Sequence, residues 1–340
     1  MIWRSKAPFR LGLAGGGTDV SPYCDRYGGA ILNVTLSLYA HTSITLNQTD
    51  EIIFQSIDQK SKIHFKAGEY APYANGLDLQ AGIYNRLLRE QLIGSQGITI
   101  TTSMDVPAGS GLGTSSTLMV SMLKAFAEML NLPYGEYDLA HKAYEIERID
   151  LGLAGGRQDQ YAATFGGVNF MEFYKDDKVI VNPLRIKSTY LNELENNIIL
   201  YFTSSSRTSS EIIKEQQKNV NSNNQKSIEA MNHLKEQSRM MKEALLTGKL
   251  NQIGEILDFG FSQKKNMAEN ISNSRMDEIY DAAKKAGATG GKISGAGGGG
   301  FMFFYCPGTS KYAVIEELKK FGGDVINYHF TTSGARSWKI

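Results

Sequence analysis

The sequence carries its most specific signal at residues 107–116, Pro107-Ala108-Gly109-Ser110-Gly111-Leu112-Gly113-Thr114-Ser115-Ser116. The segment follows a stretch that alternates like a strand and precedes apolar residues at helical spacing, so it stands at the entrance of a helix. Glycines there let the backbone wrap around a phosphate, whose charge is met by unpaired amides and by the positive helix end. The segment is not a Walker A loop, because no Gly-Lys-Ser/Thr follows its glycines. The alternative without a binding function is an ordinary helix N-cap after a glycine turn.

The pattern around this segment predicts an α+β chain with two domains, residues 1–185 and 186–340. In the first half, alternation predicts strands at 31–37, 42–46, 52–54, 98–102 and 167–173, and helical spacing predicts helices at 77–92, 114–130 and 136–149. In the second half we expect strands at 198–203, 301–305 and 325–330, a largely helical stretch at 209–285, and a helix at 311–321.

Two further glycine clusters flank the central one. Residues 8–19 contain Arg10, which can donate to a phosphate, and Asp19, which can accept hydrogen bonds from sugar hydroxyls. Taken alone, each also fits a surface ion pair or a cap. Residues 290–300 contain a formal GxGxxG, but they run into a strand-like segment instead of a helix, so a dinucleotide fingerprint is excluded. A loop that packs against a phosphate or substrate and a tight turn both remain open.

A fourth segment, residues 145–160, supplies carboxylates. Phosphoryl transfer needs a hard cation held by oxygen ligands and a carboxylate near the attacking hydroxyl. Glu147 and Asp159 can fill these roles, and Asp159 comes shortly after the glycine pair 155–156, which lets the chain approach a ligand closely. The alternative for Glu147 is a solvated helix position.

Composition favours a small-molecule partner. Lys and Arg total 36 and Asp and Glu total 35, so the chain lacks the positive field that gathers nucleic acid or anionic membrane. The two cysteines, Cys24 and Cys306, form neither a disulfide framework nor a zinc pattern, which fits a reducing compartment. With no signal-peptide pattern and no long apolar run, we expect a cytoplasmic protein without a membrane segment. A monomer and a homodimer both remain open.

The four segments PxRxxLxGGGTD, PxGSGLGTSS, GGRQDQ and KISGAGGGGF, in this order, resemble the GHMP kinases, and the resemblance covers nearly the whole chain. It implies a two-domain fold with an N-terminal domain like the second domain of ribosomal protein S5 and a C-terminal ferredoxin-like domain. It also implies an active site between the domains that uses ATP and Mg2+.

The resemblance assigns roles to residues of this chain. Asp159 matches the catalytic carboxylate and Arg10 the basic residue beside it, while Ser115 and Glu147 match the magnesium ligands. The ATP-binding residues would be Pro107, Gly109, Ser110, Gly111, Leu112, Gly113, Thr114, Ser115 and Ser116. The substrate-binding residues would be Gly15, Gly16, Gly17, Thr18, Asp19, Gly156, Arg157, Arg207, Gly297 and Gly298.

Within the family the sequence is most similar to the heptose 7-phosphate kinases and the L-fucokinases. Galactokinases carry Glu and His where this chain has Gly16 and Gly17, which argues against galactose. The implied reaction is phosphorylation of the anomeric hydroxyl of D-glycero-D-manno-heptose 7-phosphate, for a surface heptose. Arg157, Arg207 and Lys292 are the candidates for binding the distal phosphate. Two alternatives remain, a kinase of an unphosphorylated sugar and a nucleotide-binding regulator that has lost catalysis.

Overall fold

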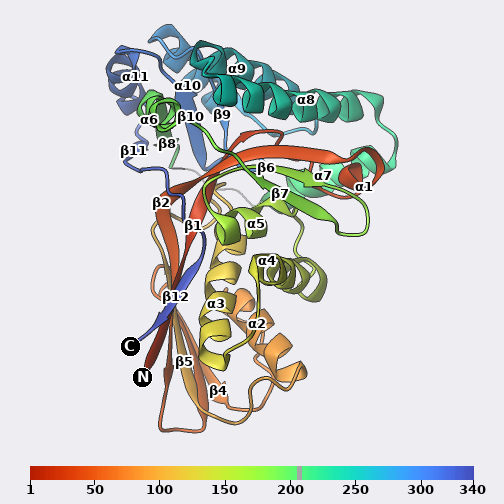
Figure 1. The fold of residues 1–340 in the computed structure, drawn as a ribbon, viewed down its shortest axis with the longest axis vertical. Helices are drawn as coiled ribbons and strands as arrows, with labels where there is room; N and C mark the ends of the chain where they lie inside the picture. The colour runs from red at the N-terminus through yellow and green to blue at the C-terminus, as the bar shows by residue number, and fades with distance from the viewer. Residues whose placement is uncertain (205–208) are drawn as a thin grey trace.

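The computed structural model describes residues 1–204 and 209–340 and builds them around two β-sheets. In Figure 1 the larger sheet runs through the lower part of the molecule, and the smaller sheet lies above it under a group of helices. The larger sheet has the strand order β12-β1-β2-β5-β3-β4, and β6 continues it from β2 to β7. The smaller sheet has the order β11-β8-β10-β9.

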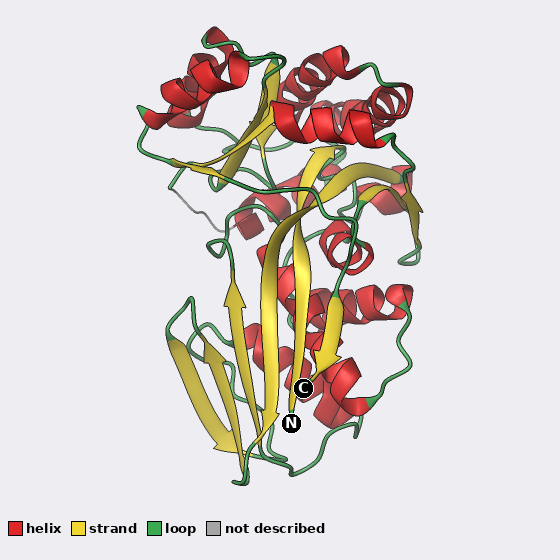
Figure 2. Ribbon diagram, turned by 60° about the vertical axis from the view of Figure 1, so that its left-hand side comes forward, coloured by secondary structure: helices red, strands yellow, loops and turns green. Residues whose placement is uncertain are grey.

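The larger sheet is formed mainly by the first half of the chain. Its strands are β1 (Ile2–Ala14), β2 (Gly29–Leu46), β3 (Glu51–Ser56), β4 (Ser61–Lys66), β5 (Ile98–Met104), β6 (Val168–Phe173), β7 (Val179–Pro183) and β12 (Arg336–Lys339). The helices of this half are α1 (Tyr23–Tyr27), α2 (Asp78–Arg89), α3 (Thr114–Leu130), α4 (Glu136–Tyr144) and α5 (Gln158–Phe165). Figure 2 shows the long strands on one side and the helices behind them.

Strand β1 was not predicted from the sequence. Its first half alternates between buried and more exposed residues, but from Ala7 to Ala14 every residue is buried. Helix α3 packs against β1 and β2, and helix α8 (Gln225–Thr247) of the second half also packs against both strands. Because this half of β1 is buried throughout, it lacks the alternation of a half-buried strand, and residues 8–19 stood out only as a glycine cluster.

The helix that carries the predicted phosphate segment begins where the sequence placed it. Gly113 precedes α3 with a φ of 78°, and Asn131 ends the helix in the left-handed region with a φ of 53°. The helix predicted at 136–149 divides into α4 and a π-helical turn, η1 (Glu145–Asp150). Glu147 lies in this turn, and π-helical turns often occur at functional sites.

The smaller sheet consists of β8 (Ile198–Phe202), β9 (Gly290–Ile293), β10 (Phe301–Tyr305) and β11 (Asp324–Ile326). Its helices are α6 (Ser188–Asn197), α7 (Ser209–Asn221), α8 (Gln225–Thr247), η2 (Leu250–Gln252), α9 (Ile253–Lys264), α10 (Ser274–Lys285) and α11 (Ser310–Lys319). The strand predicted at 325–330 is correct only in its first part, because after Ile326 the chain leaves the sheet.

The last residues return to the first sheet. Strand β12 pairs antiparallel with β1, with Lys339 opposite Trp3 and Arg336 opposite Lys6, and the two termini lie close together (Figure 1). A division at residue 185 therefore places β1–β7 before the boundary and β8–β11 after it. Strand β12 also follows the boundary in the chain, but it belongs to the larger sheet. No helix in residues 1–204 or 209–340 is both long and apolar enough to cross a bilayer.

A buried glutamine links the two halves. The Gln237 side chain on α8 accepts a hydrogen bond from the Gly15 amide at 3.1 Å and donates one to the Ile256 carbonyl on α9 at 2.9 Å. A Cβ at Gly260 would lie 1.9 Å from Gln237 Nε2, so glycine is needed there to accommodate the amide. One side chain thus fixes the end of β1 against two helices of the second half.

We predict that Gln237→Ala lowers the free energy of unfolding by about 1–3 kcal/mol, because it leaves the buried Gly15 N–H without this partner and removes the hydrogen bond to the Ile256 carbonyl. Urea titration followed by circular dichroism measures the change. Gln225→Ala, at an exposed position on the same helix, is the matched control and should stay within about 0.5 kcal/mol of the parent. Equal destabilisation in both variants would contradict the linking role of Gln237.

Candidate active site

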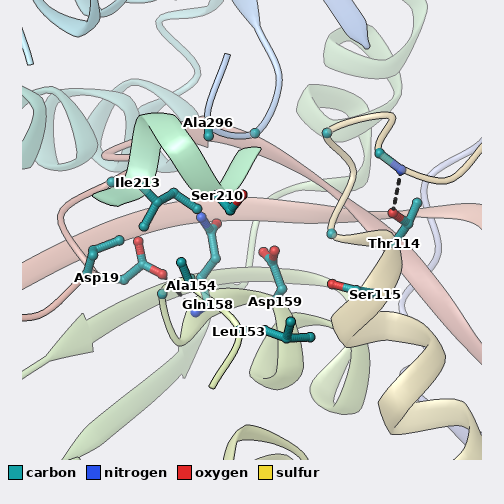
Figure 3. A pocket seen from close by; sticks show the side chains of 18 of the residues that line it. Asp19, Thr114, Ser115, Leu153, Ala154, Gln158, Asp159, Ser210, Ile213 and Ala296 are labelled. Atoms are coloured by element: carbon teal, nitrogen blue, oxygen red, sulfur yellow. Dashed lines mark hydrogen bonds between the residues drawn. The ribbon is translucent and has the colours of Figure 1, made fainter. Parts of the chain in front are cut away.

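A cavity of about 610 Å³ brings together residues from distant parts of the chain. Its lining comes from the β1–α1 loop, the phosphate segment 107–116, residues 153–159, helix α7, Lys264 and residues 295–296. In Figure 3, Thr114 and Ser115 lie on one side of the cavity, Asp19 on the other, and Asp159 between them. Ser210 and Ile213 of α7 and Ala296 cover the cavity from the second half of the chain (Figure 3).

The phosphate segment has the backbone that its glycines predict. Gly109, Gly111 and Gly113 have φ values of 71°, 85° and 78°, a region that other residues rarely adopt. Gly113 is the N-cap of α3 and provides no side-chain cap, so the first amides of the helix can donate to an anion. The buried Ser110 Oγ has no hydrogen-bond partner among the described residues. These donors suit a phosphate.

Arg10 and Asp159 form an ion pair at the centre of the cavity. Arg10 Nε lies 2.7 Å from Asp159 Oδ1, and Arg10 Nη1 donates to the Gly111 carbonyl at 2.8 Å. A Cβ at Gly113 would lie 3.0 Å from Asp159 Oδ2, so this carboxylate oxygen faces the phosphate segment. The arrangement can orient a hydroxyl next to a bound phosphate.

Asp19 lies across the cavity from the start of α3. Its Oδ2 accepts a hydrogen bond from the backbone N–H of Gln158 at 3.0 Å, and burial raises the pKa of this carboxyl group. A Cβ at Gly156 would lie 1.8 Å from the same oxygen, so no larger residue fits there. Gly156 thus lets the backbone approach a buried carboxylate, and Gly155 does the same for the Arg148 guanidinium, whereas the sequence suggested that the pair serves the approach of Asp159 to a ligand.

Glu147 is fully buried and connects η1 with the phosphate segment. Its Oε1 accepts from Ser115 Oγ and its Oε2 from Ser116 Oγ, both at 2.7 Å. Gln160 donates to Oε2 at 2.7 Å, and Arg148 Nη1 lies 3.2 Å from Oε1. The predicted pair Ser115 and Glu147 is thus in direct contact, and both residues offer hard oxygen ligands.

Lys264, at the end of α9, contributes a buried ammonium group to the cavity wall. Its side chain donates to the Gly295 carbonyl, and no carboxylate of the described residues lies within salt-bridge distance. Burial, followed by the charge of Arg10, lowers the pKa of Lys264 to about 8. Lys292 on β9 is also buried, and its pKa is lowered by burial and by Lys264.

Several predicted residues support the cavity without lining it. Leu112 lies in the hydrophobic core. The Thr18 hydroxyl donates to the carbonyls of Gly15 and Ala30 and so fixes the loop that carries Asp19. Other predicted residues outside the lining are Pro107, Ser110, Ser116, Gly15, Gly16 and Glu147.

Three substrate assignments change. Arg157 points away from the cavity, because its guanidinium pairs with Asp25 and Asp177 and donates to the Tyr174 carbonyl, so we remove it from the substrate ligands. Gly297 and Gly298 lie against Ile271, and residues 295 and 296 line the cavity instead. Arg207 lies outside the described residues.

Sequence reasoning missed Lys264, Arg148 and Gln160. Lys264 occurs at helical spacing with Leu257, Gly260 and Phe261 on the buried face of α9, and a lysine on an apolar face was the available signal. Arg148 follows Glu147 directly, and its guanidinium occupies the space that Gly155 leaves open. Nothing in the local pattern indicated Gln160.

The chain belongs to the GHMP kinase family, which confirms the predicted α+β fold. The profile of the GHMP kinases N terminal domain matches residues 79–167, and the profile of the GHMP kinases C terminal domain matches residues 241–324. The chain is 48% identical to a D-glycero-alpha-D-manno-heptose 7-phosphate kinase of Campylobacter jejuni, with 99% of each chain covered. It is 24% identical to a bifunctional fucokinase/GDP-fucose pyrophosphorylase of Arabidopsis thaliana, over 94% of this chain and 32% of that protein.

Solved structures agree with this assignment. The structure of a D-glycero-D-manno-heptose 1-phosphate kinase from Bacteroides thetaiotaomicron is 43% identical, with a TM-score of 0.85 and 99% of each chain covered. A putative sugar kinase from Campylobacter jejuni is 46% identical, with a TM-score of 0.82, and covers 100% of this chain and 98% of its own.

The pKa of Lys264 predicts a pH-dependent effect on stability. Because the folded pKa of about 8 is below the usual value of 10.5, the charged amine destabilises the folded protein fully below pH 8, by about 3 kcal/mol. The cost disappears as pH rises from 8 toward 10.5. Ligand-free Lys264→Met should therefore exceed the parent in thermal midpoint below pH 8, and the difference should shrink above it.

The exposed neighbour Lys265, paired with Asp277 at 2.6 Å, provides the control. Lys265→Met should show no such pH-dependent difference from the parent in differential scanning calorimetry. If Lys264→Met were less stable than the parent throughout the pH range, the Lys264 ammonium group would stabilise the folded protein and the expectation would be wrong.

Proposed function

We propose that the protein transfers the γ-phosphoryl group of ATP to the anomeric hydroxyl of D-glycero-D-manno-heptose 7-phosphate, giving the 1,7-bisphosphate for a surface heptose. The observation that carries the proposal is the position of the Arg10–Asp159 pair between the phosphate segment and Asp19. The names of the similar proteins add the substrate class, because both refer to heptose monophosphates.

In this proposal the phosphate segment binds ATP through the amides at the start of α3 and the hydroxyls of Thr114 and Ser115. Asp19 and the amides around Gly17 bind the sugar hydroxyls. The Asp159 carboxylate accepts the hydrogen bond of the attacking hydroxyl and orients its oxygen toward the phosphate. Arg10 stabilises the negative charge that develops in the transfer and keeps Asp159 in place.

Mg2+ fits the oxygen atoms of Ser115 and Glu147, which are in contact at 2.7 Å. The described residues contain no cluster of three His, Cys, Asp or Glu side chains that would hold a metal alone. Magnesium commonly binds to one or two carboxylates together with substrate phosphates, which suits a single buried Glu. When bound, the ion neutralises charge on the ATP phosphates.

An acceptor panel tests the proposal. The panel contains D-glycero-D-manno-heptose 7-phosphate, the corresponding heptose 1-phosphate, free heptose and L-fucose, with NMR to locate the new phosphate. We expect the highest kcat/KM for the 7-phosphate, with product at the anomeric carbon. Preference for the 1-phosphate or for a free sugar would contradict the proposed acceptor. Tight ATP binding with no turnover on any acceptor would indicate a regulator.

Asp159→Asn should lower kcat at least about 100-fold, because the amide cannot accept the hydroxyl proton or pair with Arg10. The KM for ATP should change little, since the phosphate segment is untouched. Steady-state kinetics measures both constants. Asp281→Asn, at an exposed position, serves as the control. Turnover within a few-fold of the parent would exclude the orienting role of Asp159.

Glu147→Gln should raise the Mg2+ concentration for half-maximal activity by about 10- to 100-fold, because a carboxylate ligand is lost. Glu145→Gln is a matched control in the same π-helical turn, since Glu145 pairs with Arg86 at 3.0 Å. A magnesium titration of activity distinguishes the two. An unchanged requirement in the Glu147 variant would remove Glu147 from the metal site.

A further inference from the structure

Two cations in the active-site region are not matched by carboxylates. Arg10 pairs with Asp159, and Arg148 pairs with Glu147. Lys264 and Lys292 are 2% and 3% exposed, and neither forms a salt bridge with any described residue. Asp19 attracts Lys264 over a longer distance, but one buried carboxyl group does not neutralise two ammonium groups.

Such an arrangement is unfavourable in the ligand-free protein. A buried charge costs free energy unless it is paired and hydrogen-bonded. The Lys264 ammonium has three donors and uses one for the Gly295 carbonyl, and Lys292 donates no hydrogen bond to a described residue. Unused donors and unmatched charge next to the cavity together indicate that an anion completes this part of the site.

The position of the two lysines favours the acceptor side. A Cβ at Gly16 would lie 3.8 Å from Lys292 Nζ, so Lys292 reaches the loop that leads to Gly17 and Asp19. Lys264 itself lines the cavity. The proposed ATP phosphates have separate donors at the start of α3, where Thr114 and Ser115 lie on the other side of Asp159 from Asp19 (Figure 3).

We propose that Lys264 and Lys292 together bind the phosphate group carried by the acceptor, and so select a phosphorylated sugar over a free one. The inference rests on the proposed function, which it deepens by naming the residues that read the acceptor phosphate. Two ammonium groups suit a phosphate dianion, because each can donate to its oxygens through charge-assisted hydrogen bonds. Lys292 Nζ lies next to Gly16, which places its ammonium group on the loop that carries Asp19.

The competing role for Lys264 is contact with the phosphoryl group in transfer. Gly295, which accepts from Lys264, packs against Gly111 of the phosphate segment, since a Cβ at Gly295 would lie 2.8 Å from the Gly111 Cα. A lysine that served only the transferring group would lower kcat for every acceptor equally. A lysine that reads the acceptor phosphate changes the preference between acceptors.

The test measures kcat/KM for D-glycero-D-manno-heptose 7-phosphate and for free heptose at saturating MgATP, in the parent, Lys264→Met, Lys292→Met and Lys265→Met. We expect the preference for the phosphorylated acceptor to fall by about 10- to 100-fold in the first two variants. Lys265→Met should keep the parental preference. An unchanged preference with both activities reduced equally would overturn the inference and assign Lys264 to the transfer step.

A binding measurement separates this inference from the proposed function. Calorimetry with inorganic phosphate, in the presence of Mg2+ and a non-hydrolysable ATP analogue, reports an anion site while the ATP position is filled. We expect binding in the parent and at least about 10-fold weaker binding in each of the Lys264 and Lys292 variants. Lysine-dependent phosphate binding without turnover of any heptose phosphate would refute the proposed substrate and retain the anion site. Turnover of the heptose phosphate with no dependence on either lysine would refute only the inference.

Discussion

The site depends on one ion pair, between Arg10 on β1 and Asp159 on α5. Arg10 also donates to the Gly111 carbonyl, so a single guanidinium fixes a central strand, a helix and the phosphate segment relative to one another. The pair is almost entirely shielded from water on the arginine side, where 4% of the side chain is exposed. Because the planar guanidinium of Arg10 donates to both Asp159 and the Gly111 carbonyl, it fixes the orientation of the Asp159 carboxylate in the cavity.

Glycine sets the distances around this pair. At Gly113 a Cβ would press on Asp159, at Gly156 on Asp19, and at Gly111 on the carbonyl of Ser294. A side chain at any of these three positions would therefore collide with the neighbouring segment, so the segments can lie this close only where each of them has a glycine. This explains why the chain concentrates glycine in clusters: each cluster is a place where the main chain meets a functional carboxylate or another loop of the site.

Charge in the cavity favours function at the expense of the stability of the ligand-free protein. The two arginines are matched by carboxylates, but Lys264 and Lys292 remain buried without salt bridges in the described part of the chain. An anionic ligand would satisfy them, and binding would then offset the cost of their burial. Helix α9 brings Lys264 from the second half of the chain to a cavity whose catalytic pair comes from the first, and strand β9 places Lys292 beside Gly16 of the β1–α1 loop.

The sequence alone determined the family and the helix that follows the phosphate segment, because glycines and hydroxyls at fixed spacing express local backbone requirements. The roles of Arg10 with Asp159 and of Ser115 with Glu147 were expected only from the resemblance to the GHMP kinases, and the structure brings the members of each pair into contact. The sequence did not reveal strand β1 or the return of β12 to the first sheet, since these two strands pair although their residues are more than 300 positions apart. The tertiary structure also decided the roles of the long cations. Arg157 looked like a ligand beside a glycine pair but turns toward Asp25 and Asp177, whereas Lys264 was passed over within a long helical stretch but faces the cavity. A long flexible side chain can reach several places from one backbone position, and only the packing around it selects among them.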